Sequence, residues 1–348
     1  MNKDQIYEVS FQIIMNSGEA RSMAMESIAE AKKGNIENAR NLLTQAREEI
    51  NYFIGIDIGG TNLRAAILNE DYVIVDKIKI KNNVLDGPEK NLLNLINCIN
   101  EKWSNYDFAS IGIGCPGPLN IKEGIILNPP NLKSWENFNI KKFFEEKLKK
   151  PVIVNNDANV AAYSEAIIGA GKGKESVYYI TLSTGVGGGF IYKGEIVNGF
   201  NSMAAEICNM IINEDEYSHS GLNKGGLEGQ CSGTAISRIA SKINNKKIST
   251  EEVFTEAKKV NKEYKSILDT WVVNVSKAIA NIISVVDPEI IVLGGSVILN
   301  NSSYLENIIS EVEKRVFKQT KVNIKLAEIG DDTGLIGSGI LASSCILK

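Results

Sequence analysis

The chain is poor in the residues that build covalent and metal frameworks. Its 348 residues include one histidine and five cysteines, and no two cysteines form a Cys-x-x-Cys pair. This pattern favours neither a disulfide framework nor a zinc cluster, and it predicts reduced thiols in a cytoplasmic protein. The single histidine, His219, has no evident cysteine or acid partner, so we expect it to be exposed to solvent rather than to bind a metal.

Positive charge and long apolar runs are also lacking. The formal net charge is −4, so no basic field is available to hold a polyanion, and nucleic acid is not an expected partner. The longest apolar candidate, residues 278–299, is interrupted by Asp287, Pro288 and Glu289, so no membrane span is expected. The N-terminus also lacks the basic start and apolar core of a signal peptide. With 43% hydrophobic residues, the chain suits about two well-packed globular domains.

Two kinds of pattern divide the chain near residue 52. Residues 1–51 carry apolar side chains at helical spacing, and Gly34 with Asn35 interrupts them, which predicts two antiparallel helices. From residue 52 onward, short β-rich runs alternate with helical segments. The expected strands are 52–58, 63–68, 72–81, 108–114, 151–154, 176–182, 188–193, 195–197, 290–293 and 322–327. The main expected helices are 88–103, 140–149, 158–169, 302–317 and 334–346.

This alternation predicts an α/β fold with mixed sheets. A strand, a glycine turn and a second strand occur twice, from residue 52 and again from residue 176, which predicts two similar halves with a cleft between them. The expected domains are a helical hairpin over residues 1–51 and two lobes over residues 52–174 and 175–348.

The first glycine turn lies in residues 54–68, IGIDIGGTNLRAAIL. Asp57 ends an apolar run, and Gly59, Gly60 and Thr61 follow it. Glycines let the backbone turn tightly and approach a bulky anion, and an acid beside bound phosphate indicates a divalent cation such as Mg²⁺ between them. An ordinary glycine hairpin is the alternative interpretation.

The second turn lies in residues 177–191, VYYITLSTGVGGGFI, where Ser183 and Thr184 supply hydroxyls and Gly185 begins a glycine-rich strand. As a partner of the first turn it would form a second phosphate loop, and the alternative is again a purely structural hairpin. The strand IIVLGG at residues 290–295 ends in Gly294 and Gly295. These glycines favour either a strand-to-helix turn or the close approach of a flat ring such as adenine.

A carboxylate follows another predicted strand in the string NNDAN, residues 155–159. Asp157 stands where a helix N-cap is expected, which is its structural interpretation. A helix N-terminus also keeps an acid ionised and oriented, and a carboxylate aimed at an alcohol is what phosphoryl transfer to a hydroxyl group needs.

Two other glycine strings are not nucleotide motifs. Residues 111–119, IGIGCPGPL, contain GxGxxG, but Pro116 and Pro118 predict a rigid loop where a dinucleotide site needs a helix. Residues 169–175, GAGKGKE, lack the Ser or Thr and the preceding strand of a P-loop.

Seven strings in order closely resemble the ROK family (repressors, unknown reading frames and sugar kinases), and together they span about residues 52–346. They are DIGGTNLRAAIL, IGIGCPGPLN, NNDANVAAYSEAIIGAGKG, STGVGGGFIYKGEIVNGFNSMAAEI, GGLEGQCSGTAI, DPEIIVLGGSV and GDDTGLIGSG. The resemblance implies a two-lobed actin/hexokinase-like (ribonuclease-H-like) fold that binds ATP and a sugar between its lobes.

The resemblance also implies roles for single residues. Asp157 would be the base for the sugar's 6-hydroxyl group, and Asp57 would act on Mg²⁺ through water. The residues implied to bind the sugar are Asn156, Asp157, Glu206 and Glu228. The residues implied to bind ATP are Gly59, Gly60, Thr61, Thr184, Gly185, Gly294 and Gly295.

The chain departs from the family at the zinc site. Many members have a histidine in an E-x-G-H-M string and then a CxCGxxGC cluster. Here Asn209 replaces the histidine, and the later string GLNKGGLEGQC has no cysteine pair. Tetrahedral thiolate and imidazole coordination cannot be assembled from these residues, so we predict a zinc-free member. Asn209 remains a candidate sugar-binding residue in place of the histidine.

Residues 5–50 carry a second resemblance, to the first two helices of the lactose/cellobiose-type enzyme IIA of the sugar phosphotransferase system. The position of that family's phosphoacceptor histidine falls near Ile54, inside the first predicted strand, so the phosphorylatable part is missing. Two amphipathic helices bury little surface alone. The hairpin is therefore expected to serve docking or assembly, and a homodimer or higher homo-oligomer is expected.

The sequence thus predicts an ATP-dependent hexose 6-kinase of glucokinase type. N-acetylmannosamine or N-acetylglucosamine kinase and β-glucoside kinase are the alternatives within that class. A sugar-responsive regulator is the alternative of another class, and it is disfavoured because the leading hairpin is acidic and has only two helices where family repressors carry a helix-turn-helix.

Overall fold

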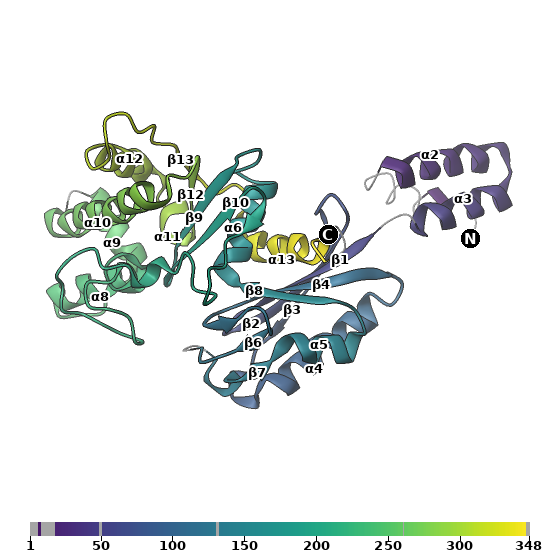
Figure 1. Ribbon diagram of the computed structural model, residues 1–348, viewed down its shortest axis with the longest axis horizontal. Helices are drawn as coiled ribbons and strands as arrows, with labels where there is room; N and C mark the ends of the chain where they lie inside the picture. Colours follow the sequence, from purple (N-terminus) through teal and green to yellow (C-terminus); the bar gives the residue numbers. More distant parts are fainter. Residues whose placement is uncertain (1–5, 8–17, 49–50, 130–131, 260, 346–348) are drawn as a thin grey trace. The chain divides into compact units, whose positions relative to one another are not determined.

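The computed structural model describes residues 6–7, 18–48, 51–129, 132–259 and 261–345. The hairpin predicted at the N-terminus is present as α2 (Gly18–Lys33) and α3 (Ile36–Glu48), which lie side by side (Figure 1). Gly34 joins them with a φ of 87°, a conformation that glycine adopts without strain. Small buried residues such as Ala31 and Ala39 let the helices approach, and the Ser27 hydroxyl donates to the Ala39 carbonyl at 2.8 Å.

The chain forms two compact units, Met1–Asn155 with Gly334–Lys348, and Asn156–Thr333. This division differs from the expected lobes at two places. Residues 156–174 belong to the second unit, because α6 (Asp157–Ile167) packs on that unit's sheet. The last helix, α13 (Thr333–Ser343), crosses back and packs on the sheet of the first unit.

The first unit is built on a five-stranded sheet in the order β3-β2-β1-β4-β8. Its strands are β1 (Tyr52–Ile58), β2 (Asn62–Leu68), β3 (Ile74–Lys81), β4 (Phe108–Cys115) and β8 (Val152–Asn156). The first three are antiparallel neighbours, and β4 runs parallel to β1. The helices α4 (Pro88–Lys102) and α5 (Ile140–Leu148) share the core of one face, against Ile54 and Ile56 (Figure 1).

The opposite face of that sheet receives α13, which lies along β1 and β4 (Figure 1). A Cβ atom on Gly55 would overlap the Leu335 carbonyl oxygen, and one on Gly112 would overlap that of Ser338. The backbones are close enough that the Ser338 hydroxyl donates to the Ile56 carbonyl at 2.9 Å. The isoleucines of β1 thus face α4 and α5, whereas Gly55 and Asp57 face the α13 side, as strand alternation requires.

The second unit repeats this plan, with a sheet in the order β11-β10-β9-β12-β13. Its strands are β9 (Ser176–Leu182), β10 (Val186–Tyr192), β11 (Glu195–Ile196), β12 (Ile290–Gly294) and β13 (Ile324–Leu326). Antiparallel β9 and β10 are followed by parallel β12, so the predicted duplication is confirmed. The large core lies around α10 (Lys262–Val286), α8 (Gly233–Asn244), α9 (Thr250–Lys258) and α12 (Leu305–Glu313), and α6 covers the other face.

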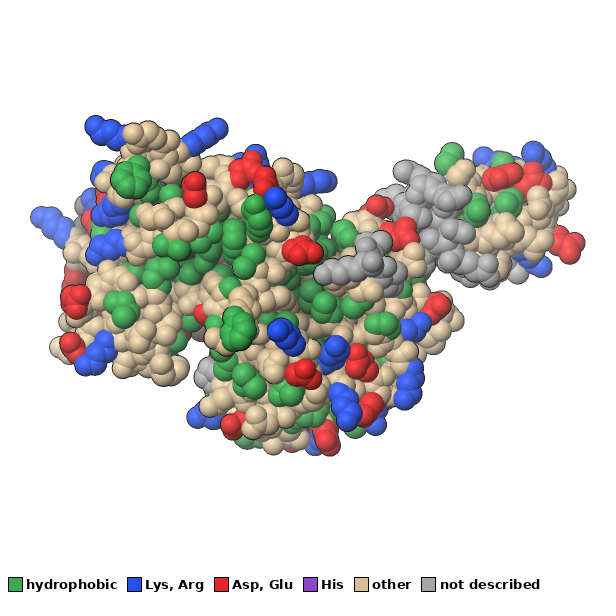
Figure 2. Space-filling model, viewed as in Figure 1, with side chains coloured by type: hydrophobic (Ala, Val, Ile, Leu, Met, Phe, Trp, Pro, Cys, Tyr) green, Lys and Arg blue, Asp and Glu red, His purple; other side chains and the backbone are tan. Residues whose placement is uncertain are grey.

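Short elements complete the two units. They are β5 (Leu119–Asn120), β6 (Ile125–Ile126) and β7 (Phe138–Asn139) in the first unit, and α7 (Leu227–Cys231) and α11 (Ser296–Leu299) in the second. The GxGxxG string is followed by β5 rather than a helix, which agrees with its rejection as a dinucleotide motif. Among the described residues, no helix is both long and apolar enough to cross a bilayer. On the face shown in Figure 2, acidic and basic side chains are interspersed.

Candidate active site

In the first unit, Asp57 is held by an ion pair that was not predicted. Asp57 and Arg64 lie opposite each other in the β1–β2 register, and the Arg64 Nε donates to Asp57 Oδ2 at 2.8 Å. Both side chains are mostly buried. The pairing could have been found from the sequence, because a four-residue turn after Ile58 places the two residues across from each other. A charge-assisted bond of this kind fixes the carboxylate's orientation.

The glycine turn beside Asp57 is closed by backbone bonds. The Gly59 N–H donates to the Asn62 carbonyl at 2.9 Å, and Asn82 donates through its Nδ2 to the Gly59 carbonyl at 2.8 Å. Gly60 and Thr61 are exposed at the tip of the turn. The turn is therefore rigid at its base and accessible at its tip, which is the arrangement a phosphate-binding turn needs.

In the second unit, the glycines of β10 serve close packing on both faces of the strand. A Cβ on Gly189 would lie 2.5 Å from the Ala162 Cβ of α6, and one on Gly187 would lie 3.0 Å from the Ala158 Cβ. On the opposite face, a Cβ on Gly188 would lie 2.7 Å from the Ala205 carbonyl oxygen. These three glycines therefore let α6 and the segment around Glu206 pack against one strand.

The turn between β9 and β10 is tied to α8 and α11. The Ser183 carbonyl accepts from the Gly233 N–H at 2.7 Å, and the Thr184 carbonyl accepts from the Thr234 hydroxyl at 2.7 Å. The Ser183 hydroxyl lies 3.2 Å from the Ser296 hydroxyl. Thr184 is exposed at this turn, so its hydroxyl remains available to a ligand.

Asp157 is the first residue of α6, and the residue before it is the N-cap of that helix. Asn156 is the N-cap, with its Oδ1 accepting from the Ala158 N–H at 2.8 Å, and Asp157 Oδ1 accepts from the same N–H at 2.8 Å. The interpretation of Asp157 as the N-cap is therefore wrong by one residue. Asp157 is exposed, and the partial positive charge of the helix N-terminus favours its ionised form.

Glu228, on α7, contacts the β9–β10 turn directly. Its Oε2 accepts from the Val186 N–H at 2.9 Å, and a Cβ on Gly185 would lie 2.6 Å from the same oxygen. Its Oε1 lies 3.6 Å from His219 Nε2. The expectation that His219 lacks an acid partner is therefore wrong, because the fold brings this loop residue close to Glu228 of α7, and sequence spacing did not link the two. The His219 side chain is about a third exposed, at 29%.

Glu206 lies close enough to Glu228 to feel its charge. The pKa of the Glu206 carboxyl is raised, first because surrounding protein removes part of its hydration and also because of the negative charge of Glu228, although the Cys208 thiol donates to it at 3.5 Å. The same surroundings raise the pKa of Cys208 to about 12, so this thiol stays protonated. The two predicted sugar-binding glutamates thus belong to one electronegative cluster.

Asn209 bonds to Asn223, and these bonds close the loop between Glu206 and α7. The Asn209 Oδ1 accepts from the Asn223 N–H at 2.6 Å, and the Asn209 carbonyl accepts from Asn223 Nδ2 at 3.3 Å. Among the described residues, no group of three or more His, Cys, Asp or Glu side chains is placed to hold a metal ion. Because its amide oxygen is engaged in the bond to Asn223, Asn209 is oriented by the loop.

The glycines that end β12 have a packing role. A Cβ on Gly294 would overlap the Tyr179 hydroxyl, and Gly295 has a φ of 87° beside the Leu182 carbonyl. Packing alone thus requires glycine at both positions, which the adenosine interpretation did not anticipate.

Comparison with known proteins agrees with this architecture. The model described as ROK family matches residues 53–344, and the model described as PTS system, Lactose/Cellobiose specific IIA subunit, matches residues 8–52. A glucokinase from Halalkalibacterium halodurans is 33% identical over 312 residues, covering 83% of this chain and 94% of the relative. An N-acetyl-D-glucosamine kinase from Haemophilus influenzae is 28% identical over 304 residues, covering 83% of this chain and 98% of the relative.

Among solved structures, a ROK hexokinase from Thermus thermophilus superimposes with a TM-score of 0.79 at 27% identity, covering 85% of this chain and 99% of that chain. These matches confirm the resemblances seen in the sequence, and they confirm the actin/hexokinase-like fold.

Proposed function

Because this chain belongs to the ROK family, we propose that it transfers the γ-phosphoryl group of ATP to the 6-hydroxyl group of a hexose, as a glucokinase-like sugar kinase. Asp157 accepts the proton of the hydroxyl group as the oxygen attacks the γ-phosphorus, and ADP leaves. Asn156, Glu206, Glu228 and Asn209 bind the other sugar hydroxyls. Glucose or a close relative is the proposed substrate.

One observation carries this proposal: three predicted catalytic and sugar-binding elements pack against β10. The helix that begins at Asp157 lies against Gly187 and Gly189, the segment of Glu206 lies against Gly188, and Glu228 bonds the N–H of Val186. That these elements share one strand of one unit supports the proposal, because phosphoryl transfer depends on the positioning of the groups that take part.

We propose ATP as the phosphoryl donor because this chain is similar to proteins named glucokinase and N-acetyl-D-glucosamine kinase. The turn residues Gly59, Gly60 and Thr61, together with Thr184 and Gly185, are proposed to bind its phosphates, and Gly294 with Gly295 to border adenosine. Mg²⁺ keeps most of its waters and needs few protein ligands, so the mostly buried Asp57 carboxylate, oriented by Arg64, fits water-mediated contact. When bound, the cation would neutralise charge on the phosphates.

Two alternatives stay open within the kinase class and one outside it. The resemblance to an N-acetylglucosamine kinase keeps N-acetylglucosamine and N-acetylmannosamine as candidate substrates, and a β-glucoside is the third candidate. A sugar-responsive regulator would bind the sugar without turnover. We further propose that the N-terminal hairpin mediates homo-oligomerisation and that the protein acts in the cytoplasm, where ATP is available.

The test is a coupled ADP-release assay with glucose, mannose, N-acetylglucosamine, N-acetylmannosamine and cellobiose. Release with one sugar supports the kinase and identifies its substrate. Sugar binding without ADP release from any of them would favour the regulator. Asp107→Asn is the matched control for changes at Asp157, because the Asp107 side chain is exposed and pairs with Lys150 at the surface.

A further inference from the structure

A histidine outside the proposed sugar-binding set lies beside one of its carboxylates. His219 Nε2 is 3.6 Å from Glu228 Oε1, and the two side chains keep 29% and 21% of their surface exposed. The other oxygen of that carboxylate, Oε2, accepts from the Val186 N–H. Oε1 is therefore the oxygen that remains for a ligand, and the imidazole lies next to it.

Packing on α7 holds the histidine in this position. Two rings of the 213–226 loop lie over Gly229, since a Cβ atom there would be 3.4 Å from Tyr217 Cδ1 and 3.9 Å from His219 Cδ2. The centroids of these two rings are 5.5 Å apart, and the Arg238 guanidinium lies 3.5 Å from the centre of the Tyr217 ring. Arg238 is itself anchored, because its Nη2 donates to the Gly229 carbonyl at 2.9 Å. The imidazole is thus positioned before any ligand binds.

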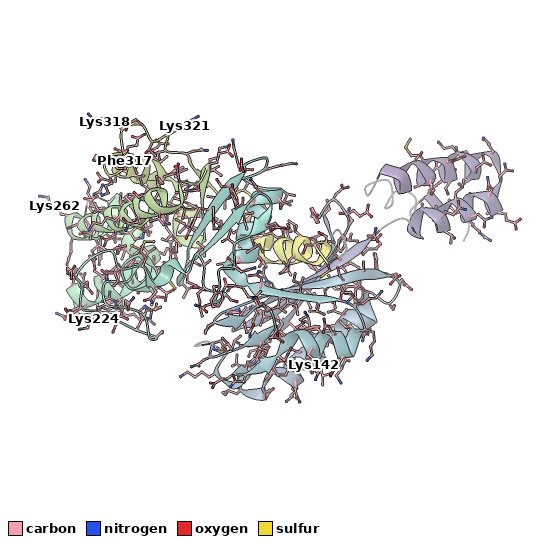
Figure 3. The ribbon with its side chains drawn as sticks, in the orientation of Figure 1. Lys142, Lys224, Lys262, Phe317, Lys318 and Lys321 are labelled. Atoms are coloured by element: carbon pink, nitrogen blue, oxygen red, sulfur yellow. The ribbon has the colours of Figure 1, made fainter. Side chains whose placement is uncertain are left out.

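The surroundings of the imidazole favour a proton on Nε2. His219 Nδ1 lies 3.3 Å from the Ser220 hydroxyl. A hydroxyl group that donates to Nδ1 leaves the ring proton on Nε2, and the nearby carboxylate favours the same tautomer. Lys224, the cation of this loop, lies at the edge of the second unit (Figure 3), where it pairs with Glu216. The donor that the loop brings beside Glu228 is therefore the imidazole rather than the ammonium group.

The separation of the two groups fits a hydroxyl group between them. At 3.6 Å, Nε2 and Oε1 are too far apart for a hydrogen bond of roughly 2.7–3.2 Å, but one oxygen atom can lie about 2.8 Å from both. A hydroxyl group both donates and accepts, so it can donate to Oε1 and accept from Nε2. We propose that His219 and Glu228 together bind one hydroxyl group of the hexose, and that His219 helps to determine sugar specificity. This inference rests on the proposed function, in which Glu228 binds the sugar.

Because His219 is the only histidine of the chain, its imidazole NMR signal needs no assignment. The untagged full-length protein, made with ¹³C-labelled histidine, is titrated with glucose, mannose, N-acetylglucosamine, N-acetylmannosamine and cellobiose. We expect a saturable shift of this signal with the sugar that supports ADP release. A sugar that binds in calorimetry but leaves the signal in place would overturn the inference and retain the proposed function. A saturable shift without ADP release from any sugar would count against the kinase but retain the sugar contact.

Variants separate sugar binding from loop packing. His219→Leu removes the donor but keeps an apolar side chain against Tyr217, whereas His219→Gln restores an N–H donor. We expect the sugar KM to rise about tenfold in His219→Leu and to stay within about threefold of the wild type in His219→Gln. The values of kcat, ATP KM and the urea midpoint should change little, because only ground-state binding of the sugar is lost. Ser218→Ala, at the exposed neighbouring residue, is the matched control. An unchanged sugar KM in His219→Leu, or a loss shared by sugar KM, ATP KM and stability, would refute the contact.

Deoxy analogues of glucose identify the hydroxyl group that His219 binds. The KM of the 1-deoxy, 2-deoxy, 3-deoxy and 4-deoxy compounds is measured for the wild type and for His219→Leu. For one analogue we expect a rise of about tenfold in the wild type and of less than about threefold in His219→Leu, because the variant has already lost that bond. Rises that are equal in the two proteins for all four analogues would overturn a direct contact between His219 and the sugar.

Discussion

Replacing Asp157 by asparagine is the sharpest perturbation of the proposed mechanism, because the structure predicts a large effect on chemistry and a small one on folding. Asparagine keeps an Oδ1 that can accept from the Ala158 N–H, and Asn156 already accepts from the same group. The variant therefore loses the interaction of a negative charge with the helix N-terminus. That loss is worth about 0.3–1 kcal/mol, and we expect the free energy of unfolding to fall by an amount of this order.

The expected effect on catalysis is much larger. An amide cannot accept the proton of the sugar hydroxyl group, and loss of a general base lowers kcat by roughly 10²–10⁴-fold, or about 3–5 kcal/mol in the activation barrier. Since the amide oxygen still accepts hydrogen bonds, the sugar Kd should stay within about threefold.

The assay is coupled ADP release for kcat, with isothermal titration calorimetry for sugar binding and urea unfolding for stability. Asp107→Asn, the exposed control, should match the wild type in all three. A kcat within tenfold of the wild type for Asp157→Asn would refute the role of base, and a collapse of sugar binding in a folded variant would assign Asp157 to binding instead.

Three further predictions follow from the packing, the electrostatics and the hairpin. Gly189→Ala places a methyl group 2.5 Å from the Ala162 Cβ, so we expect overpacking to lower the free energy of unfolding in urea by about 1–3 kcal/mol, and unchanged stability would contradict the packing role of this glycine. The pKa of Glu206 is raised above its ordinary value of 4.5 in the folded chain, so the folded state binds more protons than the unfolded state, and stability falls as pH rises from 4.5 through the raised pKa. Glu206→Gln should remove this slope in thermal unfolding at a series of pH values, and an unaltered slope would exclude Glu206 as its source. Deleting residues 1–50 should leave kcat within about twofold and lower the number of copies per particle, as measured by light scattering; a folded deletion that has lost kcat, or one with an unaltered number of copies, would refute the assembly role of the hairpin.

Much of the fold could be predicted from local signals. The strand of Asp57 and the buried strand from residue 290 were marked by apolar runs that end in an acid or in glycine, and both are present. The strand expected at residues 188–193 is present as Val186–Tyr192. The helical hairpin was marked by Gly34, whose positive φ the structure confirms. Such signals succeed because periodicity and turn chemistry act over a few residues.

The division into units could not be predicted in the same way. The last helix, α13, consists mainly of small and apolar residues. It fits on the first sheet because Gly55 and Gly112, more than two hundred residues away in the sequence, have no Cβ atom to collide with it. The contacts of α6 with the glycines of β10 also join two separate elements, although these lie closer together in the sequence. The expected boundary between the two lobes was based on the order of the elements along the chain. The observed units are instead set by which surfaces are complementary enough to pack together.

The sequence by itself determined the family, the two glycine turns and the helix that begins at Asp157, because each is carried by residue types at short and fixed spacing. Only the tertiary structure decided that His219 lies close to Glu228 and that the β10 glycines are packing sites. These outcomes depend on which side chains come close together when the chain folds, and no local sequence pattern specifies which side chains these are.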